Sequence, residues 1–294
     1  MRTVFLGTSD FAVAVLERLA RSAHAPLLVV TRPDRPRGRG RKLTAPPVAA
    51  AARRLGVDLL QPPSVNDEAA RAQIAGRRPE AICVCAFGAL IKEPLLSDYL
   101  MLNVHPSLLP RWRGAAPIER AIMAGDDRTG VSIMRVTAGL DSGPVYLQES
   151  EPIRAGDTYG TLATRLERLA GELLVRTLDE LPQGVEQDDS QATYAEKITA
   201  ADRRLDPRQP AAVVERVVRA LTPHIGAQVE LLDGTLLGVG EARVVSDGPP
   251  PGVLALAGRR PVLGCAEGAL ELVAVRPPGR RPMSGEDYLR GLRR

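Results

Sequence analysis

Short apolar runs alternate with amphipathic stretches along the first 185 or so residues of the chain. The apolar runs are rich in Val, Ile and Leu and predict β-strands. These strands are expected at Thr3–Leu6, Leu27–Thr31, Glu80–Cys85, Leu100–His105 and Gly130–Val136. The stretches between them repeat apolar residues at helical spacing. Helices are therefore expected at Asp10–Arg21, Pro47–Leu55, Asn66–Gly76 and Ala115–Ala124.

A series in which strands and helices alternate predicts an α/β fold, a Rossmann-like domain with a mostly parallel sheet. Ligands of such sheets bind beyond the carboxyl ends of the strands, so residues just after a strand are candidates for chemistry. The first such turn, Gly7-Thr8-Ser9-Asp10, lacks the second and third glycines of a dinucleotide-binding loop. We expect a simple strand-to-helix turn, capped by Ser9 or Asp10.

The remainder of the chain changes character. Tyr159 to Leu181 carries leucines three and four residues apart and predicts a helix that packs on the sheet. Residues 182–210 are rich in Gln, Asp and Pro and suggest a linker, and Ala211–Leu221 predicts a further helix. Short apolar segments separated by Gly or Pro then predict a small, OB-like β-barrel. They lie at Gln228–Leu232, Leu236–Val245, Gly252–Ala257, Pro261–Cys265 and Ala269–Val275.

The length of 294 residues agrees with this two-domain reading. We expect a catalytic domain over residues 1–185, a linker over 186–205 and the β-barrel domain over 206–294. No leader peptide is visible, and the longest apolar run, Ala81–Ile91, is much shorter than the roughly 20 residues that span a bilayer. The sequence therefore predicts a cytoplasmic protein without membrane association. A net charge of +4 permits an anionic partner without requiring one.

The cysteines do not point to metal chemistry. The chain has only Cys83, Cys85 and Cys265, which cannot all pair, and the C-x-C spacing differs from that of structural zinc sites. We expect packed core thiols and no bound metal.

Asn103 and His105 stand two residues apart at the end of a predicted strand. Residues i and i+2 of an extended segment point to the same face, so the two side chains can enter one cleft. Pro106, Pro110 and Pro117 restrict the chain that follows, which predicts a stiff loop. An isolated Asn-x-His with prolines is more often an ordinary turn.

A second strand end favours the functional interpretation. The apolar segment from Gly130 runs into Gly139-Leu140-Asp141-Ser142-Gly143, and the chain contains only three histidines, His24, His105 and His224. A carboxylate at Asp141 beside His105 would favour the charged imidazolium and orient it. Asn103 and His105 would then be two donors for a developing oxyanion, as acyl-type transfer requires.

These segments resemble the active-site motifs of the folate-dependent formyltransferases. The stretch Asn103 to Ile122, NVHPSLLPRWRGAAPIERAI, is especially similar to the methionyl-tRNA formyltransferase branch, and the likeness covers nearly the whole chain. It implies that Asn103, His105 and Asp141 are the catalytic group. It also implies that the segment Ser107, Leu108, Leu109 and Pro110 lines the site for the formyl donor, 10-formyltetrahydrofolate.

A basic segment follows the second predicted strand. Residues 32–47 hold six cations and one carboxylate, with Gly and Pro expected to prevent regular structure. Most charge runs are merely solvated, but a long irregular loop in a compact α/β domain is uncommon unless it has a function. The expected RNA contacts are Arg37, Arg39, Arg41 and Lys42. Such a loop resembles the insertion by which methionyl-tRNA formyltransferases engage the tRNA acceptor stem.

The resemblance implies transfer of a formyl group from the folate to the α-amino group of methionyl initiator tRNA, with no protein partner required. Arg276, Arg280 and Arg281 are further candidates for RNA contact or simply solvated charges. One alternative is a sugar-nucleotide N-formyltransferase, which would keep the site and use the loop for a diphosphate. Another is a non-catalytic RNA-binding module, which would leave Asn103, His105 and Asp141 without a purpose.

Overall fold

The computed structural model describes residues 1–37, 40, 42–231, 233–256 and 258–292. The chain forms two compact units. The first consists of residues 1–114, 129–151 and 163–194, and the second of residues 115–128, 152–162 and 195–294. The domain and linker boundaries expected from the sequence stay a prediction.

The first unit is built on a seven-stranded sheet whose order is β10-β9-β7-β6-β1-β2-β5. Its strands are β1 (Thr3–Gly7), β2 (Pro26–Val30), β5 (Leu59–Leu60), β6 (Ala81–Cys85), β7 (Leu100–His105), β9 (Arg128–Arg135) and β10 (Val145–Pro152). The five strands from β5 to β7 in this order pair in parallel. The predicted mostly parallel α/β sheet is therefore confirmed.

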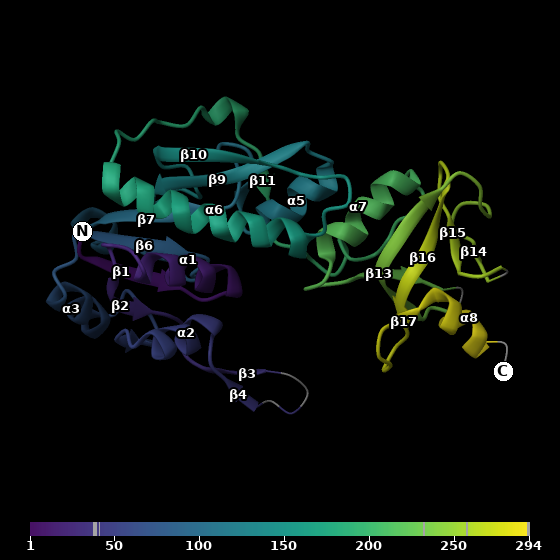
Figure 1. Cartoon of the computed structure of the whole chain (residues 1–294), viewed down its shortest axis with the longest axis horizontal. Helices are drawn as coiled ribbons and strands as arrows, with labels where there is room; N and C mark the ends of the chain where they lie inside the picture. Colours follow the sequence, from purple (N-terminus) through teal and green to yellow (C-terminus); the bar gives the residue numbers. More distant parts are fainter. Residues whose placement is uncertain (38–39, 41, 232, 257, 293–294) are drawn as a thin grey trace. The chain divides into compact units, whose positions relative to one another are not determined.

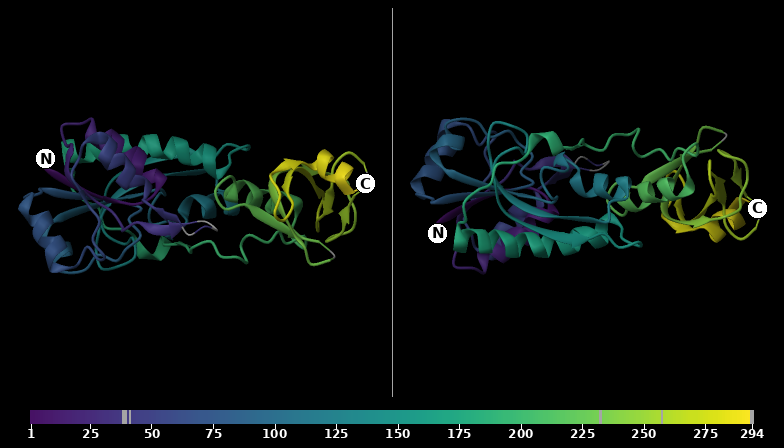
Figure 2. Two further views of the ribbon diagram at one scale, coloured as in Figure 1. Left: turned by 90° about the horizontal axis from the view of Figure 1, so that it is seen from below. Right: turned by 90° about the horizontal axis from the view of Figure 1, so that it is seen from above.

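Helices lie on both faces of this sheet (Figures 1 and 2). They are α1 (Asp10–Ala20), α2 (Pro47–Leu55), α3 (Glu68–Gly76), α4 (Leu95–Asp98) and α6 (Tyr159–Glu180). A further helix, α5 (Pro117–Ala124), belongs to the second unit. Ser9 caps α1 by accepting from the backbone N–H of Ala12, as expected. All six leucines of α6 are buried, so the predicted packing of this helix is confirmed.

Several short elements escaped the sequence pattern. They include the paired strands β3 (Arg35–Arg37) and β4 (Lys42–Thr44), the paired strands β8 (Arg113–Gly114) and β11 (Tyr194–Ala195), and the 3-10 helix η1 (Asp189–Gln191). The expectation that residues 32–47 lack regular structure was wrong. Arg35 pairs with Thr44 and Pro36 with Leu43 in an antiparallel hairpin.

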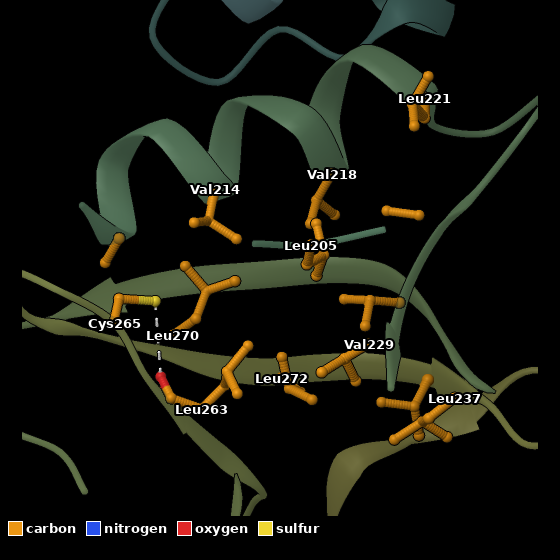
Figure 3. Close-up of a cluster of buried hydrophobic side chains, with 14 residues drawn as sticks. Leu205, Val214, Val218, Leu221, Val229, Leu237, Leu263, Cys265, Leu270 and Leu272 are labelled. Carbon is orange, nitrogen blue, oxygen red and sulfur yellow. Dashed lines mark hydrogen bonds between the residues drawn. The ribbon is translucent and has the colours of Figure 1, made fainter. Parts of the chain in front are cut away.

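The C-terminal part of the second unit is an antiparallel sheet of six strands with α7 (Ala211–Leu221) packed on it. The strands are β12 (Ala227–Glu230), β13 (Leu236–Val245), β14 (Leu254–Ala255), β15 (Val262–Gly264), β16 (Ala269–Arg276) and β17 (Met283–Ser284), followed by α8 (Gly285–Leu292). Figure 3 shows Val214 and Val218 of the helix facing Leu270 and Leu272 of β16. The predicted β-rich C-terminal region is confirmed.

All three cysteines are buried and free. Burial raises the pKa of Cys83 to about 12 and also raises those of Cys85 and Cys265, because the thiolate loses its hydration. We expect none of them to react with a thiol reagent at pH 8 in the native protein and all of them to react in denaturant. Rapid labelling of native protein, followed by mass spectrometry, would contradict this packing.

No helix of the described residues combines the length and apolarity that crossing a membrane requires.

Candidate active site

The candidate site forms around the second half of β7. Asn103 and His105 alternate with buried neighbours on this strand, so both side chains lie on one face, as expected. Asp141 lies in the loop between β9 and β10. Its Oδ1 is 3.5 Å from Asn103 Nδ2, and its Oδ2 is 3.6 Å from His105 Nδ1. The structure thus brings together the three residues selected from the sequence.

The route by which Asp141 arrives differs from the expected one. The sequence placed both site segments at carboxyl ends of parallel strands, but β9 runs antiparallel to β7, with His105 opposite Ser132 and Leu102 opposite Arg135. The end of β9 therefore lies beside the middle of β7. The following loop returns along β7, and a Cβ on Gly143 would lie 2.1 Å from the carbonyl oxygen of Arg135. This close approach requires glycine.

The Asp141 carboxylate accepts a main-chain hydrogen bond. The φ of Asp141 is 45°, an uncommon value for a residue with a side chain. The backbone N–H of Gly114 donates to Asp141 Oδ2 at 2.9 Å. Because that bond is shorter than the contacts to Asn103 and His105, Gly114 supplies the firm anchor of the carboxylate. The long contacts from Asn103 Nδ2 and His105 Nδ1 leave both of these groups able to donate a hydrogen bond to another acceptor.

His105 is 3% exposed, and its Nε2 lies 2.8 Å from the carbonyl oxygen of Trp112. A carbonyl oxygen only accepts, so Nε2 carries the hydrogen of this bond. Nδ1 is then the ring nitrogen that faces Asp141 and the side chain of Asn103. Of the two nitrogens, Nδ1 is the one placed for proton exchange or for donation to a reacting oxygen.

Two residues that the sequence reasoning missed support this arrangement. Gln187, from a segment interpreted as linker, donates to the carbonyl oxygens of Asp141 and Gly143 at 2.9 and 2.7 Å. The buried Arg113 donates to Gln187 Oε1 at 3.0 Å and pairs with Asp189 at 2.7 Å. No local pattern marks Gln187, because its partners are more than 40 residues away in the sequence. In the sequence, the only indication of this arrangement was a charged residue, Arg113, inside the Asn103–Ile122 motif.

The segment Ser107, Leu108, Leu109 and Pro110 follows β7 directly. Ser107 is fully buried and donates to the carbonyl oxygen of Arg111 at 2.6 Å, and Leu109 is buried too. Leu108 and Pro110 are partly exposed. Contact with a ligand would therefore come from these two side chains and from main-chain atoms.

Hydrogen bonds, together with the expected prolines, hold this segment. Ser132 Oγ donates to the carbonyl oxygen of Ser107 at 2.6 Å and accepts from the N–H of Leu109 at 3.2 Å. Gln148 Nε2 donates to the carbonyl oxygen of Leu109 at 2.9 Å. The segment is thus fastened to β9 and β10, which form the end of the sheet.

The basic hairpin stands at the same edge of the sheet as His105, because β2 and β7 run in the same direction. Gln61 Nε2 ties its base by donating to the carbonyl oxygen of Arg32 at 3.0 Å and to Asp34 Oδ1 at 2.8 Å. Of the four residues predicted to contact RNA, Arg39 and Arg41 lie outside the described residues. The backbone of Arg37 and Lys42 forms the last described pair of the hairpin.

The whole chain is similar to formyltransferases. Residues 1–178 match the family described as formyl transferase, and residues 197–293 match its C-terminal domain. The chain is 42% identical to the methionyl-tRNA formyltransferase of Methylococcus capsulatus, over 98% of this chain and 96% of that protein. Identity to the enzyme of the same name from Halorhodospira halophila is also 42%, over 99% and 96% of the two chains.

Solved structures show the same fold at low sequence identity. HypX from Aquifex aeolicus in complex with tetrahydrofolic acid aligns with a TM-score of 0.68 at 19% identity, over 98% of this chain. This chain spans about half of that longer protein, 47% of its length. An N-formyltransferase from Helicobacter canadensis, in complex with folinic acid and dTDP-3-aminofucose, aligns with a TM-score of 0.68 at 12% identity, over 92% of this chain and 99% of that one.

Proposed function

The chain belongs to the formyl transferase family, and on this premise we propose that it transfers the formyl group of 10-formyltetrahydrofolate to the α-amino group of methionine on initiator tRNA. The observation that carries this proposal is the identity of about 42%, over nearly the full length, to methionyl-tRNA formyltransferases. The convergence of Asn103, His105 and Asp141 supports it independently.

In the reaction, the amine nitrogen attacks the formyl carbon, and the carbonyl oxygen becomes an oxyanion. Asn103 Nδ2 and His105 Nδ1 are the two donors that would stabilise this charge. The bond between the formyl carbon and N10 of the folate then breaks, while the new bond to the amine remains. One proton moves from the amine to N10, so the products are the formylated amine and tetrahydrofolate.

In this proposal the two ring nitrogens of His105 have different roles. The carbonyl oxygen of Trp112 fixes Nε2 at 2.8 Å and thereby sets the plane of the ring. Nδ1 then faces both the reacting oxygen and Asp141. The carboxylate of Asp141, anchored by Gly114, balances a charged imidazolium and lies where it can relay the amine proton.

The two substrates would approach along neighbouring segments. Leu108, Pro110 and the main chain between them would contact the folate, whose formyl group must reach Asn103. The acceptor end of the tRNA would lie against the hairpin of β3 and β4, through Arg37, Arg39, Arg41 and Lys42. Cationic side chains at the edge of the sheet that carries the site suit phosphate contacts.

A sugar-nucleotide N-formyltransferase remains the second candidate. The likeness to the Helicobacter canadensis structure, at 12% identity, supports only the shared fold. A non-catalytic RNA-binding module explains neither the burial of His105 nor the three polar groups that converge on it. We therefore favour the enzyme that acts on methionyl-tRNA.

Purified protein mixed with 10-formyltetrahydrofolate and charged initiator tRNA tests the proposal. We expect formylmethionyl-tRNA, detected after deacylation by mass spectrometry, and equimolar tetrahydrofolate. A dTDP-linked amino sugar and uncharged tRNA are the comparison substrates. Formylation of the amino sugar but not of methionyl-tRNA would establish the second candidate instead.

Trp112 is the only tryptophan and reports on the candidate site. Its carbonyl oxygen contacts His105, and the guanidinium carbon of Arg111 lies 4.4 Å from the centre of its ring. We expect a folate analogue or tRNA to change its emission or its quenching by acrylamide, after correction for ligand absorbance. An indole signal that stays constant at saturating amounts of both ligands would count against placing the folate at Leu108 and Pro110.

A further inference from the structure

Gln187 and Arg113 form a connected set of hydrogen bonds behind Asp141. The amide nitrogen of Gln187 donates to the carbonyl oxygens of Asp141 and Gly143 at 2.9 and 2.7 Å. These two carbonyls belong to the turn that begins at Asp141, where φ is 45°. A residue with a side chain keeps such a conformation only when its surroundings hold it there. Gln187 is the side chain that bridges this turn.

Arg113 decides which way the amide of Gln187 points. Its Nε donates to Gln187 Oε1 at 3.0 Å, and this bond leaves the NH2 group directed at the two carbonyls. A reversed amide would place an oxygen against two carbonyl oxygens and an NH2 group against the guanidinium. The Arg113 side chain is only 4% exposed, and its charge is balanced by Asp189, which is 81% exposed.

Arg113 also precedes Gly114, whose N–H holds the carboxylate of Asp141. Two adjacent residues of β8 therefore fix Asp141 twice. Gly114 holds its carboxylate, and Arg113, acting through Gln187, holds its main chain. A shift of the turn would move Oδ1 away from Asn103 and Oδ2 away from His105.

We propose that Gln187, oriented by Arg113, is a positioning residue that holds Asp141 in register with His105 and Asn103. The inference rests on the proposed function, because the register matters for turnover only if these three residues carry the reaction. Gln187 has no contact with a reacting atom in this scheme. Its effect passes entirely through Asp141.

The test uses Gln187→Met, which keeps the length of the side chain and removes its hydrogen bonds, and Gln187→Glu. In Gln187→Glu an acceptor still faces Arg113, but a carboxylate oxygen opposes the two carbonyls. Gln191→Met is the matched control, since Gln191 lies on the same segment, is exposed and contacts Asp188. Melting temperatures identify the variants that are folded at the assay temperature. One folded Gln187 variant is enough for the test.

We expect kcat to fall by about 10- to 100-fold, as misplacement of a reacting group by about 1 Å does. KM for both substrates should stay within about twofold, because Gln187 touches neither in this scheme. Ring ¹⁵N resonances of His105, assigned with a His105 variant, should shift in the Gln187 variants, while those of His24 and His224 stay in place. Gln191→Met should change neither kcat nor these resonances.

A wild-type kcat in a folded Gln187 variant would overturn the inference, as would a loss confined to KM or an equal loss in Gln191→Met. Failure of the proposed function is distinguishable, because it would appear in the wild-type protein as an absence of methionyl-tRNA formylation. The His105 resonances need no substrate and would then decide the inference alone. Unmoved resonances would reject it, and a shift restricted to His105 would support it.

Discussion

Substitution of Asn103→Ala or His105→Ala should lower turnover by about 100-fold or more. Each change removes one of the two donors proposed to face the developing oxyanion, and loss of one such donor costs about 2.7–4 kcal/mol of transition-state stabilisation in other acyl-transfer sites. Because both donors stabilise the same charge, the reduction of turnover in the double variant should be much smaller than the product of the two single reductions. Single-turnover formylation at saturating folate and tRNA measures the chemical step directly.

His24→Ala is the matched control for His105. His24 is also buried in the first unit, where its ring contacts Asp179 and the amino terminus, far in the sequence from Asn103. Its loss should lower the melting temperature and leave turnover unchanged at a temperature where the protein is folded. Near-normal turnover in folded Asn103→Ala and His105→Ala proteins would refute the proposed chemistry.

Joint neutralisation of Arg37, Arg39, Arg41 and Lys42 to Gln should weaken tRNA binding and flatten its dependence on salt. Each phosphate contact with a duplex contributes about 0.9 to the slope of log K against log salt, so loss of four contacts should reduce the slope by about 3 to 4. Binding of a folate analogue should persist, because the folate segment is fastened to β9 and β10 instead. Filter binding or anisotropy at several salt concentrations measures both quantities.

Four exposed cations elsewhere on the first unit provide the control for net charge. Arg21, Arg77, Arg168 and Arg176 each have an exposed side chain and an acidic partner, and exposed ion pairs contribute little to stability. Their neutralisation should change the salt slope much less than neutralisation of the hairpin. Equal salt slopes for the two quadruple variants would show that the hairpin is a solvated segment with no specific role in tRNA binding.

The elements that the sequence predicted well have strong local signals. Helix α2 begins at Pro47 and ends before Gly56, whose φ is 70°, so both of its bounds are set by residues within the segment. Strand β7 was also placed correctly, from its apolar run and the proline that follows. Strand β10 escaped detection because most of its residues are partly or fully exposed, as suits an outer strand, and the apolar pattern is absent.

The sequence pattern did not predict the direction of β9. Apolar residues mark a strand in the same way whether it runs parallel or antiparallel to its neighbour. The predicted position of Asp141 was therefore correct although the argument from parallel strand ends was not, since the returning loop brings Asp141 to His105. For the hairpin of β3 and β4 the predicted structure itself was wrong. Its Pro and Gly residues suggested irregular chain, but the two segments pair as strands.

The sequence by itself determined the candidate site residues and most of the longer helices and strands, because those patterns depend on residues a few positions apart. Only the tertiary structure decided the contact partner of each His105 nitrogen, the burial of Ser107 and the hydrogen bond from Gln187 to Asp141. Asp141 and Gln187 are 46 residues apart, and Arg113 and Gln187 are 74 apart. Contacts across such separations form only after both packed segments reach the same place, so no local pattern encodes them.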